Sequence, residues 1–284
     1  MAEERQLAVE QTYKGSDYSL LCNHDLFNER IRIEHYSGNP EHVIAQVQSL
    51  FTTDYSKCIV KVKDNDVSTF RTYGFTYEGT INNYFSGIDM HIMTKFNEGW
   101  RRNASRWMDE EQILEGVLTK VPSPLAEKPV MRRASEKDAE KLATLYKSVF
   151  EVYPTPMDQA DYIRKVMKED TIFYVVDEGS IISSAASAEV NHKFQNAEIT
   201  DCATLPEFRK SGVMRHLILA LESKLLEEEI YYAYSIARSL SFGMNAVFFQ
   251  LGYEYGGRLI NNVKIYDDWE NMNLWSKRLV SSAE

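Results

Sequence analysis

The hydrophobic pattern beyond residue 130 changes its period from one segment to the next. Four apolar residues recur at three- and four-residue spacing after Ser135, which stands where a helix N-cap is expected, with Asp138 three positions further on. They are Leu142, Leu145, Tyr146 and Phe150. This spacing predicts an amphipathic helix that follows a short strand.

The segments downstream predict further strands and two more helices. Strands are expected in TIFYVVDEGSIISSAASAEV, which turns at DEGS, and in KFQNAEITDCATL, IYYAYSIAR, GGRLINNVKIY and ENMNLWSKRL. Helices are expected from Gly212 to about Glu229 and from Ser241 to a stop at Gly252. The resulting order, β-α-β-β-β-α-β-α-β-β, predicts an α/β fold with a mixed sheet and helices on its faces.

A proline-rich segment divides the chain. TKVPSPLAEKPV (119–130) has three prolines, no glycine and weak periodicity, which is typical of a linker. The amphipathic stretch SRWMDEEQILEGVL before it predicts a helix. We therefore expect a smaller N-terminal domain at 1–120, a linker at 121–130 and a larger domain at 131–284.

A weak internal repeat relates these two domains. FRTYGFTYEGTINN (70–83) aligns with FFQLGYEYGGRLINN (248–262) once one residue is inserted. Chance similarity of short strand-turn segments is the alternative, but a strand and a short helix precede both copies. The N-terminal domain is therefore expected to be a divergent, degenerate copy of the last part of the other domain, without chemistry of its own.

Composition narrows the classes of function. The 284-residue chain carries a net charge of −10, which argues against a nucleic-acid-binding surface. It has no run of 18 apolar residues and no signal-peptide core near its start, so neither a membrane span nor secretion is expected. Its three cysteines and six histidines lack the spacing of disulfide frameworks or metal sites. We expect no metal and a reducing cytoplasm.

The stretch RKSGVM connects a predicted strand to the long predicted helix. It comprises Arg209, Lys210, Ser211, Gly212, Val213 and Met214. Unpaired N–H groups at a helix start, a glycine that allows close approach and two cations suit an anion such as a diphosphate. The stretch is neither a Walker A loop nor a GxGxxG loop. On these residues alone, a plain strand-to-helix turn fits equally well.

The surrounding residues resemble the GCN5-related N-acetyltransferase (GNAT) family. RKSGVM is similar to its motif [RQ]-x-x-G-x-[GA] at Arg209 and Gly212, whereas Met214 departs from the usual Gly or Ala. The segments TDCATLPEFR, AYSIAR, GMN, GYEYGGRLINN and YPTP resemble one subgroup, the β-lysine N6-acetyltransferases. The resemblance implies a GNAT fold in which the loop holds the diphosphate of acetyl-coenzyme A. It also implies a small-molecule amine as acetyl acceptor.

Further coenzyme contacts are implied by the same resemblance. The strand through Cys202, Ala203 and Thr204 should pair its backbone with the pantetheine arm, where two parallel strands splay apart. Asn245 resembles the residue that touches this arm; the alternative is a helix residue bonded to its own backbone. For Cys202 itself we favour a small buried residue over a nucleophile, because no histidine is placed beside it.

Two carboxylates are candidates for the general base that the ammonium substrate requires. Glu198 is the first, because AEITDCAT resembles the base-bearing strand of histone-modifying relatives; an exposed strand-edge charge is the alternative. Asp201 is the second, and it is also a candidate for binding the acceptor. On a regular strand these two side chains would point to opposite faces, so only one could face the site.

The remaining site candidates are less specific. Phe248 occupies the position of the usual tyrosine acid, so either Tyr234 or Tyr253 would protonate the thiolate, or it leaves unassisted. Arg238 is expected to clamp the acceptor's carboxylate in bidentate fashion. Tyr153, Asn261 and Asn262 are further candidates for lining the acceptor site.

We expect the chain to acetylate the side-chain amine of β-lysine, giving N6-acetyl-β-lysine, a compatible solute. The alternatives are another amine acceptor, such as lysine, a polyamine or a peptide N-terminus, or a module that senses coenzyme A without turnover. The sequence also allows a homodimer.

Overall fold

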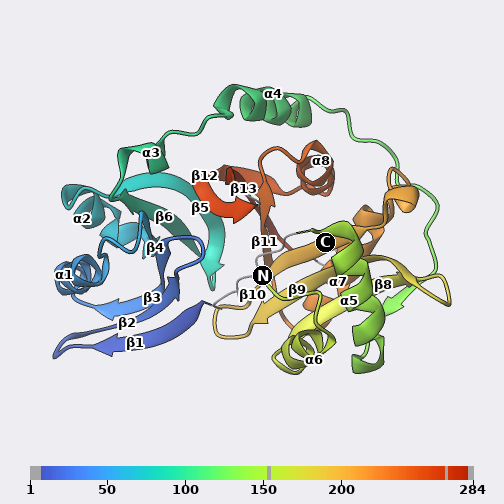
Figure 1. Cartoon of the computed structure of the whole chain (residues 1–284), viewed down its shortest axis with the longest axis horizontal. Helices are drawn as coiled ribbons and strands as arrows, with labels where there is room; N and C mark the ends of the chain where they lie inside the picture. Colours follow the sequence, from blue (N-terminus) through green and yellow to red (C-terminus); the bar gives the residue numbers. More distant parts are fainter. Residues whose placement is uncertain (1–7, 152–154, 266–267, 281–284) are drawn as a thin grey trace.

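The computed structural model describes residues 8–151, 155–265 and 268–280. Thirteen strands form one sheet in the order β1-β2-β3-β4-β6-β5-β12-β13-β11-β10-β9-β8-β7. Figure 1 shows its two parts side by side, the first blue to cyan and the second green to red, joined at β5 and β12. We call β1–β6 with their helices the first half, and β7–β13 with theirs the second half.

Among the described residues, the first half contains six strands, the helices α1 and α2, and the short helical turn η1. Its elements are β1 (Val9–Lys14), β2 (Tyr18–Asp25), β3 (Arg30–Gly38), α1 (Pro40–Leu50), β4 (Lys57–Lys63), η1 (Asp64–Asp66), α2 (Val67–Thr72), β5 (Thr76–Phe85) and β6 (Ile88–Phe96). Two helices lead to the second half: α3 (Gly99–Arg102) and α4 (Trp107–Leu118).

The second half follows the predicted order and adds one helix, α6. Its elements are β7 (Met131–Arg133), η2 (Glu136–Asp138), α5 (Ala139–Val149), α6 (Ala160–Lys168), β8 (Thr171–Asp177), β9 (Ile182–Asn191), β10 (Asn196–Thr204), η3 (Pro206–Phe208), α7 (Val213–Glu227), β11 (Tyr232–Arg238), α8 (Phe242–Gln250), β12 (Glu254–Ile265) and β13 (Asp268–Arg278). The expected mixed sheet with helices on both faces is confirmed.

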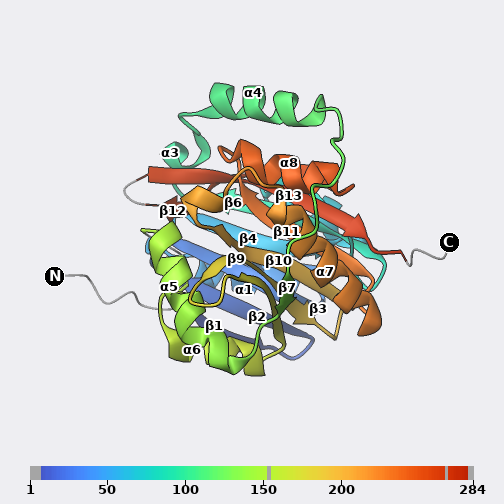
Figure 2. The ribbon, with the colours of Figure 1, turned by 90° about the vertical axis from the view of Figure 1, so that its right-hand side faces the viewer.

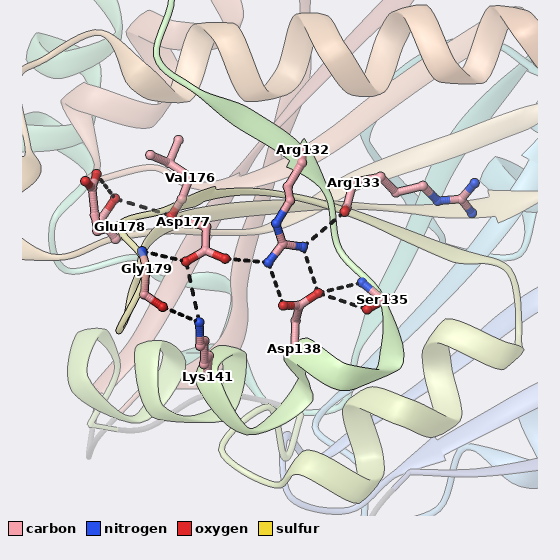
Figure 3. A network of polar contacts seen from close by, with 10 residues as sticks. Arg132, Arg133, Ser135, Asp138, Lys141, Val176, Asp177, Glu178 and Gly179 are labelled. Carbon is pink, nitrogen blue, oxygen red and sulfur yellow. Dashed lines mark hydrogen bonds and ion pairs between the residues drawn. The ribbon is translucent and has the colours of Figure 1, made fainter.

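The start of α5 is fixed by the predicted capping box. The Ser135 main-chain nitrogen donates to Asp138 Oδ2 at 2.8 Å. Arg132 of β7 donates to both oxygens of Asp138, at 2.9 and 2.7 Å, and to Asp177 at the end of β8 (Figure 3). One guanidinium therefore ties two strands to the helix that follows them.

Alternation along the strands assigns each face of the second half to its own helices. Ile172 of β8 packs in the cluster that contains α7 and α8, whereas the adjacent Phe173 packs with α5 and α6. Helix α4 lies alongside α8 (Figure 2), and its Leu114 and Val117 belong to the α7–α8 cluster. The helix before the predicted linker is thus part of the core of the second half. The predicted domain limits stay a prediction.

The two halves run through the same sequence of pairings. In the first, β2-β3-β4-β6-β5 are neighbours, with β3 parallel to β4; in the second, β9-β10-β11-β13-β12 are neighbours, with β10 parallel to β11. The halves meet where Gly79 of β5 pairs with Gly257 of β12. These two glycines also align in the repeat seen in the sequence, so equivalent positions face each other at the junction.

The remaining face of the first half is turned toward the second half. Alternate residues of β3 and β4 pack under α1 and α2, while Ile59, Ile81 and Tyr84 share a cluster with Tyr234 and Leu274 of the second half. We call this shared surface the inter-half face.

The junction predicts a stability effect. A Cβ on Gly257, whose φ is +135°, would lie 2.4 Å from the Glu78 carbonyl oxygen and 2.6 Å from Gly79 Cα. Because backbone on both sides blocks relief, Gly257→Ala should lower the free energy of unfolding by about 2–4 kcal/mol, measured by urea denaturation. Gly243→Ala is the control, since a Cβ there meets nothing within 4 Å. Equal stability of the two variants would contradict the tight junction.

Candidate active site

Strands β10 and β11 separate part-way along their length. They pair only from Asn196 to Glu198 on β10, opposite Tyr232 to Tyr234 on β11. Beyond that point β11 continues along β13, and β10 continues along β9 with a bulge between Thr200 and Ala203. Cys202, Ala203 and Thr204 therefore have no strand partner on the β11 side. This is the splay that the family resemblance implies.

The backbone of the bulge is strained. Asp201 has a φ of +49°, which is uncommon for a residue with a side chain. The Tyr146 hydroxyl of α5 donates to its carbonyl oxygen at 2.9 Å, and the Ser187 hydroxyl donates to its carboxylate at 2.6 Å. These bonds hold a conformation that the strand would not adopt alone, and they re-aim its side chain.

The predicted anion loop lies at the start of α7. Gly212 is the N-cap residue with a φ of +78°, and no side chain in the described ranges caps the helix. Among the described residues, none accepts a hydrogen bond from the main-chain nitrogens of Lys210 to Met214. A run of open N–H groups at the positive end of a helix suits a diphosphate.

Two side chains of the loop are used to shape it. Arg209 Nε donates to the Thr204 carbonyl oxygen at 3.1 Å, and Ser211 Oγ donates to the Phe208 carbonyl oxygen at 2.7 Å. The remaining donors of Arg209 and the ammonium of Lys210 form no hydrogen bond or ion pair with the described part of the chain.

The segment predicted as a linker lies along the first turns of α7. Arg215 donates to the Ser123 carbonyl oxygen at 2.9 Å, and the His216 ring bonds the Ala126 carbonyl oxygen at 2.9 Å. A Cβ on Gly212 would lie 3.2 Å from the Cβ of Ala126. The segment is therefore held beside the anion loop.

Two carboxylates stand directly opposite each other on the inter-half face. Glu198 of β10 pairs in register with Glu189 of β9, so their side chains share a face. Asp201, 6% exposed, reaches the same side because its carboxylate bonds Ser187, two residues before Glu189. Glu198 and Asp201 therefore lie on the same side of the sheet. Because of the bulge, both can face the site, whereas on a regular strand only one could.

The pKa values of Glu189 and Glu198, which we call the acidic pair, are both raised. Partial loss of surrounding water raises the pKa of Glu189 to about 8, although its side chain is exposed at the surface, and the charges of Glu198 and Asp201 add to the rise. Burial also raises the pKa of Glu198, against the opposing effects of Lys61, a hydrogen bond from Tyr234, and Arg32. A raised pKa makes a carboxylate a stronger proton acceptor than usual, as a general base requires.

The candidate proton donors to the thiolate, Tyr234 and Tyr253, lie in different parts of the second half. The Tyr234 hydroxyl is engaged with Glu198, and its ring centroid lies 5.3 Å from that of Tyr84. Phe248 is buried against Tyr253, with ring centroids 5.1 Å apart. The Tyr253 hydroxyl is buried beside Glu222, and burial, together with the charge and hydrogen bond of Glu222, raises its pKa well above the ordinary value.

Cys202 is not poised as a nucleophile. Burial, reinforced by the neighbouring Asp201, raises the pKa of its thiol well above the ordinary value, and the thiol bonds the Thr200 carbonyl oxygen. A nucleophilic cysteine requires the opposite shift.

Three expected ligand contacts are already taken within the protein. The Arg238 guanidinium is paired through two nitrogens with Glu270, so its fork is not open to a substrate carboxylate. The Asn245 side chain makes four bonds, to Arg238, Ser241, Asn273 and Trp275, which exhausts its capacity.

The Asn261 amide donates to the carbonyl oxygens of Arg101 and Asn103 and fastens the segment around α3 to the second half. The Asn262 carbonyl oxygen accepts from Arg30. The structure therefore gives these asparagines a role between the halves. Tyr153 lies outside the described residues.

Three charged residues of the inter-half face were missed by the sequence analysis: Glu189, Arg32 and Lys61. Each stands in an alternating strand, AASAEV, RIRIE or KCIVKVK, and such alternation is usually typical of a solvent-facing side. The only sequence signal is the concentration of charge on one side of strands whose other side is apolar.

Comparison with known proteins identifies the family. The family described as "Acetyltransferase (GNAT) domain" matches residues 130–256. N-acetyltransferase YodP of Bacillus subtilis is 38% identical over 95% of this chain and 99% of its own length. Beta-lysine N(6)-acetyltransferases of Methanococcus maripaludis and Methanosarcina mazei are 34% and 33% identical over 88% and 86% of this chain, covering 93% and 99% of their own lengths.

The chain therefore belongs to the GNAT family of N-acetyltransferases, as its motifs predict. It is an acetyltransferase whose acetyl donor is acetyl-coenzyme A. Within the described ranges, no group of three or more His, Cys, Asp or Glu side chains could hold a metal ion. Nor is any helix of these ranges long and apolar enough to cross a membrane.

The acidic pair predicts a pH-dependent stability difference. A carboxyl whose pKa is raised on folding stabilises the fold while protonated, and this contribution is lost as pH rises from the unfolded value, about 4.5, to about 8. The stability of Glu189→Gln relative to the wild type should therefore increase over this window, measured by urea denaturation at several pH values. Glu10→Gln, an exposed change on β1, is the matched control. A constant difference for Glu189→Gln would refute the perturbed pair.

Proposed function

We propose that the protein transfers the acetyl group of acetyl-coenzyme A to the N6 amine of β-lysine. The single observation that carries this is the acidic face of Glu189, Glu198 and Asp201 beside the splay of β10 and β11, because it suits a cationic amine. The names of two relatives, which are beta-lysine N(6)-acetyltransferases, support the same acceptor. Acetylation removes one positive charge from β-lysine, so the product has no net charge, which suits a compatible solute kept in the cytoplasm.

The coenzyme site is built from backbone. The open main-chain nitrogens from Lys210 to Met214 would hold the diphosphate, with Arg209 and Lys210 adding positive charge. The unpaired edge of Cys202, Ala203 and Thr204 would pair with the pantetheine arm. When bound, the coenzyme supplies an acetyl thioester, whose carbonyl carbon is open to attack by a neutral amine.

The chain's own residues manage the protons. A lysine-type ammonium, with an ordinary pKa of about 10.4, must lose a proton before it can attack. Glu198 accepts this proton, and Glu189 shares its charge. Tyr234 holds the Glu198 carboxylate in place. For protonation of the departing thiolate, Tyr253, whose hydroxyl lies beside Glu222, and Tyr234, whose hydroxyl lies beside Glu198, both remain candidates.

The loop generates the first functional prediction. Gly212→Asp places a negative charge and a side chain against the diphosphate, and Asp tolerates a positive φ better than most residues. We expect the affinity for coenzyme A to fall by more than about 100-fold, measured by calorimetry, while the circular dichroism spectrum is unchanged. Gly99→Asp adds the same charge in open space and should bind normally. Normal binding by Gly212→Asp would place the coenzyme elsewhere.

The proposed role of Glu198 as general base generates the second functional prediction. Glu198→Gln should lower kcat for β-lysine by about 10²- to 10⁴-fold because the amide cannot accept the proton. The KM for acetyl-coenzyme A should not change. Glu227→Gln, an exposed change on α7, is the control. Turnover by Glu198→Gln within a few-fold of the wild type would exclude Glu198 as the base.

A further inference from the structure

Cations of the first half face the acidic pair of the second half. Lys61 of β4 donates to the Tyr84 hydroxyl at 2.9 Å, the Tyr84 ring packs on Tyr234, and Tyr234 engages Glu198. Arg32 of β3 is close enough to influence both Glu198 and Glu189 electrostatically. The half that was expected to have no chemistry thus lies against the candidate base.

Arg32 has unused hydrogen-bonding capacity. Its side chain is 34% exposed, and an ion pair joins its Nε to Glu34 Oε1 at 3.1 Å. This contact is not a hydrogen bond, and both atoms are buried without a hydrogen-bond partner among the described residues. A half-buried guanidinium with open donors contrasts with Arg238, whose fork is filled by Glu270.

Glu34 completes a charge pattern on this side. It also pairs with Lys61, at 2.6 Å between Nζ and Oε2, so one carboxylate lies between two cations. From the second half toward the first, the charged groups are the acidic pair, and then Arg32 and Lys61 with Glu34 between them. A free diamino acid has the complementary groups: a reacting ammonium and a carboxylate.

The pairing register adds an independent observation. Starting from the Gly79–Gly257 pair, Ile92 corresponds to Leu274 and Ile59 to Tyr234. Arg32 pairs with Ile59 in the first half, and Glu198 pairs with Tyr234 in the second. Arg32 therefore occupies the register position of the candidate base, carrying the opposite charge.

We propose that Arg32, which has open donors, binds the carboxylate of the acceptor, and that the nearby charge of Lys61 adds to the attraction. The first half thereby selects amino acids over amines that lack a carboxylate. This inference rests on the proposed function, since it concerns recognition by the same site. Arg32 would act in binding and would take no part in the proton transfer.

The test compares β-lysine with its carboxamide, which keeps the size and the amines but removes the negative charge. The wild type should prefer the acid by about 10- to 100-fold in kcat/KM, the effect of a charged bidentate pair. In Arg32→Gln this preference should fall to within about 3-fold, through the KM of the acid, while the carboxamide reacts as with the wild type. The KM for acetyl-coenzyme A should be unchanged.

Two further variants make the result specific. Arg71→Gln, the same change at an exposed position of α2, should keep the full preference. Arg32→Lys keeps the charge without the fork, so it should keep part of the preference; it also decides the question if Arg32→Gln does not fold.

The outcomes separate the two proposals. If Arg32→Gln retains the preference, or the wild type uses acid and carboxamide equally, the role of Arg32 is wrong although the acetyltransfer stands. If the wild type acetylates neither compound, the proposed function is wrong, and the proposed role of Arg32 fails with it.

Discussion

The close approach of two backbones at Gly79 and Gly257 determines the architecture. Only there do β5 and β12 pair, and each glycine lies where a Cβ would meet backbone of the other strand. This contact makes two half-sheets into one and turns the uncovered side of the first toward β10 and β11. The inter-half face and its charges all depend on that placement, although the junction itself contains no chemistry.

The acidic pair of Glu189 and Glu198 would destabilise the fold by itself, but beside the cations of the first half it can accept a proton. Two carboxylates in register on adjacent strands repel each other, and the partial burial of Glu198 increases the penalty. The cations of the first half reduce it without closing the pair off, because Arg32 and Lys61 are both engaged with Glu34. The balance leaves carboxyls that hold a proton more tightly than usual, beside a gap in the sheet.

Local patterns in the sequence predicted what local physics determines. The loop before α7, the capping box at Ser135 and the order of strands follow from nearby residues, and the structure has them. The bulge at Asp201 could not be predicted, because it depends on bonds from Tyr146 and Ser187. Arg238 and Asn245 were assigned to ligands because their partners, Glu270 and Trp275, are distant in the sequence. Glu189 and Arg32 were missed because alternation alone cannot distinguish solvent from another half of the same chain.

The register equivalence of Arg32 and Glu198 has a consequence for how such a surface can arise. In an assembly of identical subunits, every substitution appears on both sides of the symmetry axis, so an acid at one position meets an acid at its mate. Covalent linkage of two similar halves lifts this restriction, since each copy mutates alone. Opposite charges at equivalent places are therefore accessible to a single polypeptide and forbidden to a symmetric homodimer.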